Sequence, residues 1–115
     1  MVHGGGARIG LIAYGSSDPA IREAQDQLRR EAGLETDYLR VRGYPFSREV
    51  HAFVEAHERV YVVEQNRDGQ LAALLKLDLA PERVPRLRSI AHLDGLPLDA
   101  RSVSDELLGL EGRTT

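Results

Sequence analysis

Apolar and polar positions follow one another along the chain in blocks that predict strands and helices in turn. Nearly continuous apolar runs at 8–15 and 59–65 are typical of strands covered on both faces of a parallel sheet, and an alternating run at 35–43 predicts another strand. Between and after these runs, apolar residues recur at helical spacing. We expect helices over 19–32, 48–58, 70–79 and 100–109, and a fourth strand over 87–93.

The expected helices have recognisable ends and inward faces. Asp18 is placed to cap a helix whose first residue is Pro19, and Gly33 stands where a C-cap glycine is usual. The residues expected to face the core are Ile21, Ala24 and Leu28; Val50, Phe53, Val54 and His57; Leu71, Leu74 and Leu75; and Val103, Leu107 and Leu108.

Strands that alternate with helices through short connections form βαβ units, and these build a parallel sheet between helical layers. The sequence therefore predicts an α/β fold, a three-layer αβα sandwich around a mostly parallel sheet of about four or five strands. Gly4 to Gly6 have too much backbone freedom to hold structure alone. We expect a flexible leader or linker stump over 1–7, one α/β domain over 8–109 and a frayed tail over 110–115.

Composition excludes several classes of function. The 115 residues suffice for one domain, and 15 basic against 18 acidic side chains leave a net charge of −3, so nucleic acid is not an expected partner. The chain has no cysteine, which rules out a disulfide, a thiol nucleophile and a cysteine-held zinc or iron–sulfur site.

Metal, membrane and secretion signals are also missing from the pattern. The four histidines are too scattered for a metal signature. No apolar run approaches the ~20 residues that cross a bilayer, and the start of the chain does not read as a secretory signal. We expect a cytoplasmic protein without a membrane partner.

The candidate site lies where the parallel strands end, since ligands and partners of open parallel sheets gather at the carboxyl ends of the strands. The loops 14–19, 41–47, 64–70 and 91–97 should meet at that edge. The candidate interface or ligand residues are Ser16, Ser17, Asp18, Asn66, Arg67, Asp68, Gln70, His92 and Asp94. The opposite edge is expected to be much poorer in functional side chains.

Each loop also has a structural explanation. Ser17 and Asp18 are what a helix start needs, although amides there could hold an anion. The stretch "NRDG" suffices for a tight turn, yet 64–70 carries more polar groups than a turn requires, which favours an interface. His92 is either a general base or a hydrogen-bonded structural histidine.

Motifs for known chemistries are absent. Only Gly15 stands in the loop where a dinucleotide site needs G-x-G-x-x-G, and Lys76, the one lysine, lies inside an expected helix rather than in a P-loop. There is no G-x-S-x-G elbow. No residue is therefore assigned a catalytic, cofactor-binding or metal-binding role.

Four phrases in the same order carry a resemblance: "YGSSDPAIREA", "YLRVRGYPFS", "RVYVVEQNRDGQ" and "LRSIAHLDGLPLDAR". Over about residues 8–108 the chain resembles the C-terminal domain of the alpha subunit of 2-oxoacid:ferredoxin oxidoreductases, and the 2-oxoglutarate type in particular. The resemblance implies a fold similar to the C-terminal domain of transketolase. It also implies a parent complex that uses thiamine diphosphate, a divalent metal ion, an iron–sulfur cluster and coenzyme A.

The G-D-G…N-N motif that holds the diphosphate in such enzymes has no match here, so the resemblance implies a chain that is inactive alone and holds no cofactor. The resulting hypothesis is a docking domain. Its expected partners are the other domains of the alpha subunit and the beta subunit, and homo-oligomerisation stays open. The alternative is a free-standing module that binds coenzyme A or a nucleotide at the strand carboxyl edge, with its anion site at 16–20. An independent small enzyme is a third interpretation.

Overall fold

The structure of this protein is a computed structural model, and it describes residues 2–3, 7–14, 18–41, 48–64, 70–79, 81–91 and 99–112. The strands are β1 (Val2–His3), β2 (Ile9–Tyr14), β3 (Thr36–Val41), β4 (Arg59–Glu64) and β5 (Leu87–Ala91). The helices are α1 (Asp18–Ala32), α2 (Arg48–Ala56), α3 (Gln70–Asp78), the short 3₁₀ helix η2 (Val84–Arg86) and α4 (Ala100–Leu110). Every expected strand and helix is present, with ends shifted by one or two residues.

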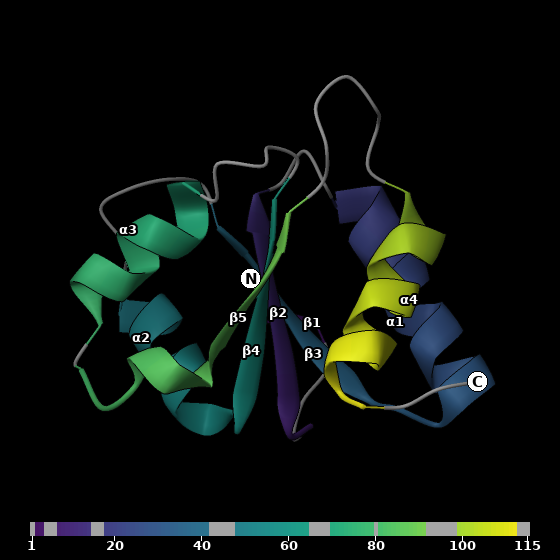
Figure 1. The fold of residues 1–115 in the computed structure, drawn as a ribbon, viewed down its shortest axis with the longest axis horizontal. Coiled ribbons are helices and arrows are strands. Elements are labelled where there is room, and N and C mark those ends of the chain that lie inside the picture. The colour runs from purple at the N-terminus through teal and green to yellow at the C-terminus, as the bar shows by residue number, and fades with distance from the viewer. Residues whose placement is uncertain are drawn as a thin grey trace.

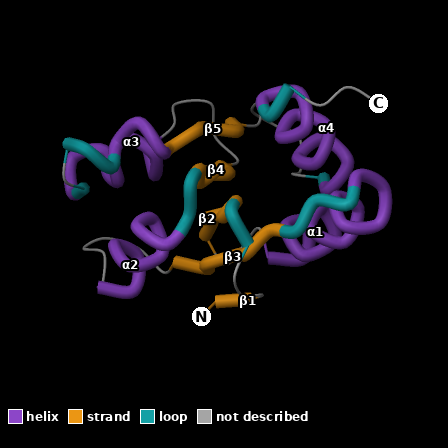
Figure 2. The backbone as a smooth tube through the Cα atoms, turned by 90° about the horizontal axis from the view of Figure 1, so that it is seen from below, coloured by secondary structure: helices purple, strands orange, loops and turns teal. Residues whose placement is uncertain are grey.

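The strands form one sheet in the order β1-β3-β2-β4-β5, which Figure 2 shows from one end. β2 pairs in parallel with both β3 and β4, and β4 pairs in parallel with β5. Only β1 runs antiparallel, against Tyr38 and Leu39 of β3. Because β2 to β5 are parallel, their carboxyl ends share one edge of the sheet and their amino ends share the other.

Helices cover both faces of this sheet. Figure 1 shows the sheet edge-on, with α2 and α3 on one side and α1 and α4 on the other. Each side encloses its own apolar core, and the central strands contribute side chains to both cores. The expected α/β sandwich with a mostly parallel sheet is therefore confirmed.

The predicted inward faces are largely confirmed. The predicted α1, α2 and α4 residues are buried, and so are Leu71 and Leu75 of α3, whereas Leu74 is only half-buried. Gly10 of β2 explains the close fit of α2, because a Cβ atom at this position would lie 2.5 Å from Phe53 Cε2 and 3.2 Å from His57 Cγ. His57 lies just beyond the helix that was expected to contain it, and it is buried all the same.

The end of α1 also follows the sequence. Gly33 has a φ of 65°, the left-handed conformation that glycine adopts without strain. Its amide donates to the carbonyl of Arg29 at 3.2 Å, which closes the last turn of the helix.

Both ends of the described chain hold structure where little was expected. Val2–His3 forms β1 inside the segment expected to be a flexible leader, and Glu111, in the segment expected to be a frayed tail, is held by Arg59. The domain limits at 8 and 109 stay a prediction. In the part of the chain that the structure describes, no helix has the length and apolar character needed to cross a bilayer.

Candidate functional site

The structure places two of the nine predicted site residues. Asp18 is the first residue of α1 and Gln70 is the first residue of α3, so each starts a helix at the carboxyl edge of the sheet. The other seven lie outside the described residues: Ser16, Ser17, Asn66, Arg67, Asp68, His92 and Asp94. The site therefore stays a prediction, and its described surroundings are the ends of the strands and the starts of the helices.

The carboxylate of Asp18 is used within the chain. Its Oδ2 pairs with Arg22 Nε, one turn further along α1, at 2.8 Å. Asp18 also lies beside the Tyr38 hydroxyl; burial first, and this neighbouring carboxylate second, raise the pKa of Tyr38. An acidic side chain in the first turn stabilises the positive end of the helix dipole.

Glu64 ends β4 and reaches the start of α3. The residue is 5% exposed, and its carboxylate accepts from the Leu71 amide at 2.6 Å and from the Ala72 amide at 3.1 Å. These amides belong to the first turn of α3, where backbone N–H groups have no partner within the helix. Although Glu64 begins the polar stretch 64–70, it faces inward and serves the fold.

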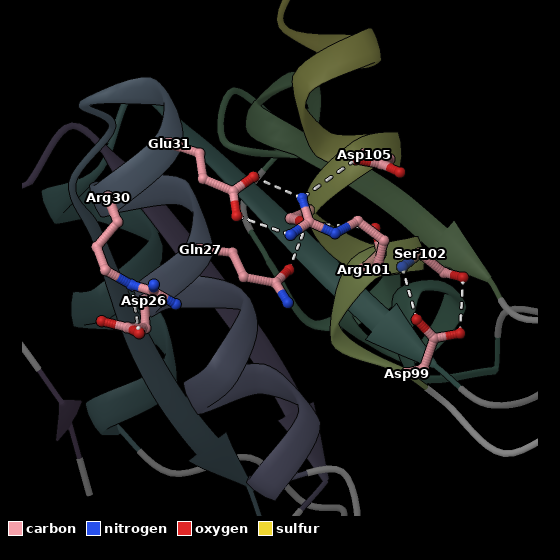
Figure 3. A network of polar contacts seen from close by, with 9 residues as sticks. Asp26, Gln27, Arg30, Glu31, Asp99, Arg101, Ser102 and Asp105 are labelled. Carbon is pink, nitrogen blue, oxygen red and sulfur yellow. Dashed lines mark hydrogen bonds and ion pairs between the residues drawn. The ribbon is translucent and has the colours of Figure 1, made fainter. Parts of the chain in front are cut away.

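Asp99 starts α4 in a similar way. Its Oδ1 accepts from the Ser102 amide at 2.9 Å and its Oδ2 accepts from the Ser102 hydroxyl at 3.0 Å, which caps the helix (Figure 3). Three helix starts at the carboxyl edge thus carry an acidic side chain of the chain itself, namely Asp18, Glu64 and Asp99.

The packing of α4 on α1 adds a polar contact between the two helices, which Figure 3 shows. Arg101 of α4 donates to both carboxylate oxygens of Glu31 of α1, at 2.6 and 2.7 Å, and this pair lowers the pKa of Glu31. Beneath it, the Ser104 hydroxyl donates to Gln27 Oε1 at 2.7 Å in the interior. The exposed pair is screened by water, so the buried bond is the more specific contact.

The opposite edge, at the amino ends of the strands, contains a buried acid–base pair. His57 Nε2 lies 2.7 Å from Asp37 Oδ2 and His57 Nδ1 lies 2.6 Å from the Phe53 carbonyl, and both side chains are 5% exposed. A carbonyl only accepts, so His57 Nδ1 donates to Phe53, and Asp37 Oδ2 also accepts from the Ala7 amide at 3.2 Å. The pair joins α2, β3 and the entry into β2.

A second cluster at the amino edge ties α4 to β4. Arg59 donates to both carboxylate oxygens of Glu111, at 2.6 and 2.7 Å, and the Tyr61 hydroxyl also donates to Glu111. Burial, and then this hydrogen bond, raise the pKa of Tyr61, so its hydroxyl stays neutral at physiological pH. Nearby, Arg86 donates to the carbonyls of Val54, Glu55 and His57 at the end of α2.

The amino edge therefore carries polar clusters that the sequence analysis did not anticipate, and the expectation that this edge is poorer in functional side chains stays a prediction. The sequence reading missed Asp37, Arg59, Tyr61 and Glu111 as interacting residues, because the pairs they form join distant parts of the chain. One signal was available, since Asp37 is an acidic residue inside the expected strand 35–43. Asp37 contacts His57, and Arg59 and Tyr61 both donate to Glu111. Among the described residues, no three metal-ligating side chains gather.

Comparison with known proteins identifies a relative in sequence. No model of a known protein family matches it. It is 39% identical over 101 residues to the alpha subunit of 2-oxoacid:ferredoxin oxidoreductase 2 of Aeropyrum pernix, a match that covers 85% of this chain and 15% of that protein.

A solved structure agrees with that relative. The fold matches the 2-oxoglutarate:ferredoxin oxidoreductase of Magnetococcus marinus, a structure with 2-oxoglutarate, coenzyme A and succinyl-CoA bound, with a TM-score of 0.80 and 25% identity. This match covers 95% of the present chain and 19% of that one. The chain thus corresponds to a small part of each of these relatives.

Proposed function

We propose that this chain, which is homologous to one part of the 2-oxoacid:ferredoxin oxidoreductase alpha subunit, serves as a non-catalytic C-terminal domain of such an oxidoreductase. In this role it supports the assembly of the subunits around an active site built elsewhere. The observation that carries the proposal is the match of nearly the whole chain to 15% of an enzyme subunit. A part of that size contributes a shaped surface while other parts supply the reactive groups.

The described charges favour this role over the alternative of an anion-binding module. Coenzyme A and nucleotides carry phosphates, and phosphates bind in α/β folds at free, positive helix starts. Here the chain's own carboxylates, Asp18, Glu64 and Asp99, stand at three of those starts. A phosphate approaching them would meet negative charge, and at the starts of α3 and α4 it would meet amides that already have an acceptor.

The partners in this proposal are the remaining domains of the alpha subunit and the beta subunit, in the cytoplasm. The parent complex would use thiamine diphosphate with a divalent metal ion, an iron–sulfur cluster and coenzyme A, all held outside this chain. The contact surface would be the carboxyl edge, with 64–70 joined by 14–19 and 91–97. Interfaces between domains of one chain are comparatively polar, which suits these loops.

The first test replaces Arg67 with alanine, because arginine is enriched at energetically important contacts. The chain would be expressed with the rest of the alpha subunit and the beta subunit, and co-purification would be compared with thermal melting of the chain alone. We expect Arg67→Ala to weaken co-purification and to leave the melting temperature within about 2 °C of the parent chain, since a side chain that serves a partner contributes little to the stability of the chain alone. Arg30→Ala is the matched control, because Arg30 is an exposed arginine on the outer face of α1 whose partner is Asp26. Wild-type co-purification of Arg67→Ala would remove the loop from the interface.

A second test separates docking from ligand binding. Calorimetric titration of the chain with coenzyme A and with thiamine diphosphate should give no saturable heat if the edge is a docking surface. Saturable binding of either compound would favour the binding-module alternative, and turnover of a 2-oxoacid by the chain alone would favour an independent enzyme. Sedimentation of the same samples would measure homo-oligomerisation.

A further inference from the structure

The outer surfaces of the two helical layers differ in chemistry. The charged side chains that α1 exposes are Arg22, Glu23, Arg29, Arg30 and Glu31. Within the helix, Arg30 pairs with Asp26 at 2.8 Å. Across the layer, Glu31 of α1 pairs with Arg101 of α4 at 2.6 Å. Charged side chains that pair along and between helices in this way are typical of a face that lies in water.

The outer face of α3 has the opposite character. Every residue from 71 to 77 is apolar except Lys76. Ala73 and Leu77 are exposed and Leu74 is half-buried, and Leu77 is 83% exposed, more than any other large apolar side chain that the structure describes. Residues three and four positions apart are neighbours on a helix surface, so Ala73, Leu74 and Leu77 form one apolar stripe. We call these three residues the α3 stripe.

The α3 stripe differs from the single exposed apolar residues that are common on protein surfaces. The inner face of α3 is already supplied by Leu71 and Leu75, which are fully buried in the core. A helix that is apolar on its outer face as well is typical of a helix with neighbours on both sides. In Figure 1, α3 lies on the opposite side of the sheet from the charged layer of α1 and α4. The apolar face therefore indicates a contact on this side of the domain.

The size of the α3 stripe and the length of the relatives favour one occupant, the rest of the alpha subunit. An interface with a free partner or a second copy uses about 20–30 residues on each side, and the α3 stripe supplies three of them. The stripe can therefore be only one part of a larger contact, and α3 begins at Gln70, on the edge already proposed as a contact surface. Most of each relative lies outside the part that this chain matches, since the chain spans 15% and 19% of the two.

We propose that the α3 stripe is a second contact surface of this domain, covered in the assembled enzyme by an apolar surface of the remaining alpha subunit. The proposal rests on the proposed docking function and adds to it one side of the sandwich. The charged face of α1 then lies toward solvent. Lys76 flanks the stripe at the rim of the contact, where its ammonium group stays hydrated while its carbon chain packs on the partner.

Leu77→Gln tests the α3 stripe, and Leu110→Gln is the matched control. Leu110 is the other exposed large apolar side chain of the described residues, and it lies on α4 in the opposite layer. Glutamine and leucine have similar helix propensities, so both variants should keep the melting temperature of the parent chain. Leu77→Gln should lower the affinity for the rest of the alpha subunit about tenfold, because the burial of a leucine side chain is lost. Leu110→Gln should bind like the parent chain, and Leu77→Met should restore most of the affinity.

Lys76 provides a direct measurement of cover. It is the one lysine of the chain, and it is exposed on α3 beside Leu77. Its rate of acetylation by an N-hydroxysuccinimide ester, followed by mass spectrometry, would be compared between the free chain and the chain assembled with the rest of the alpha subunit and the beta subunit. The rate should fall several-fold on assembly. An equal rate in the two samples would overturn the proposal.

The outcomes separate this proposal from the docking function. If the parent chain binds the rest of the alpha subunit and Leu77→Gln binds equally well, the α3 stripe is not a contact surface and the docking function stands. If the parent chain does not bind, the docking function is wrong and this proposal falls with it. Sedimentation of the chain alone tests the second copy, since a dimer that Leu77→Gln dissociates would show that the stripe joins two copies of this chain instead.

Discussion

The two edges of the sheet carry polar groups for different purposes. At the amino edge, the contacts Asp37–His57 and Arg59–Glu111 join residues that lie 20 and 52 positions apart. At the carboxyl edge, the contacts of Asp18 with Arg22, of Glu64 with α3 and of Asp99 with Ser102 span between 3 and 8 positions, and Asp18 also lies beside Tyr38 of β3. Long-range pairs hold separate elements together, whereas short-range ones shape individual turns. Most of the described polar contacts at the carboxyl edge therefore act locally, whereas those at the amino edge join distant parts of the chain.

Breaking the buried pair at the amino edge should have the largest effect. Asp37→Ala leaves His57 buried without its partner at Nε2, and removing one partner of a buried pair costs about 3–5 kcal/mol. The free energy of unfolding, measured by urea denaturation, should fall by that amount. Asp26→Ala is the control, since this carboxylate pairs with Arg29 and Arg30 on the surface of α1 and should cost less than about 1 kcal/mol. Equal losses in the two variants would contradict the comparison between buried and exposed pairs.

Gly10→Ala should have the next largest effect, because the added methyl group on β2 would crowd Phe53 and His57 of α2 and its end. The new Cβ atom would lie 2.5 Å from Phe53 Cε2, and overpacking of this kind costs about 1–3 kcal/mol. Gly109→Ala makes the same chemical change in α4, where a Cβ atom meets nothing within 4 Å. The control should gain up to about 1 kcal/mol from helix propensity. Thermal melting of the two variants should shift in opposite directions, and a shared direction would show that α2 has room to move.

Alkaline pH should have the smallest effect in the range that is practical to measure. The raised pKa of Tyr61 means that the folded chain keeps a proton which the unfolded chain loses near pH ~10. Stability from this group is complete below that value and declines as the pH rises through the folded pKa. Denaturation at about pH 8 and pH 10.5 should show this decline, and Tyr61→Phe should make it shallower. An identical slope in Tyr61→Phe would mean that the Tyr61 hydroxyl does not cause the decline in stability.

Much of the fold could be predicted because its causes are local. Apolar runs and helical spacing located every expected strand and helix to within one or two residues, and Gly33 marked the end of α1 by its backbone freedom. The two-residue strand β1 could not be found in this way. Its pairing with Tyr38 and Leu39 depends on where β3 lies, and a glycine-rich neighbourhood contains no strand pattern.

The contacts around the candidate site could be predicted less well from the sequence. Glu64 belonged to a polar stretch that predicted contact with a partner, yet its carboxylate is turned inward to α3. Nothing in the order of residues distinguishes a glutamate that faces solvent from one that holds a helix start eight residues away. For Asp18 the sequence predicted a helix cap but not its two neighbours. Its carboxylate pairs with Arg22 and lies beside Tyr38.

The sequence by itself determined the helices and the four parallel strands, the sandwich that they form and the relation to an oxidoreductase subunit, because spacing and similarity are properties of the chain as written. The tertiary structure decided which polar groups form contacts that stabilise the fold. Asp37 meets His57 and Arg59 meets Glu111 only after the strands have paired and α4 has packed, since a hydrogen bond requires two atoms within about 3 Å of each other whatever their separation in sequence.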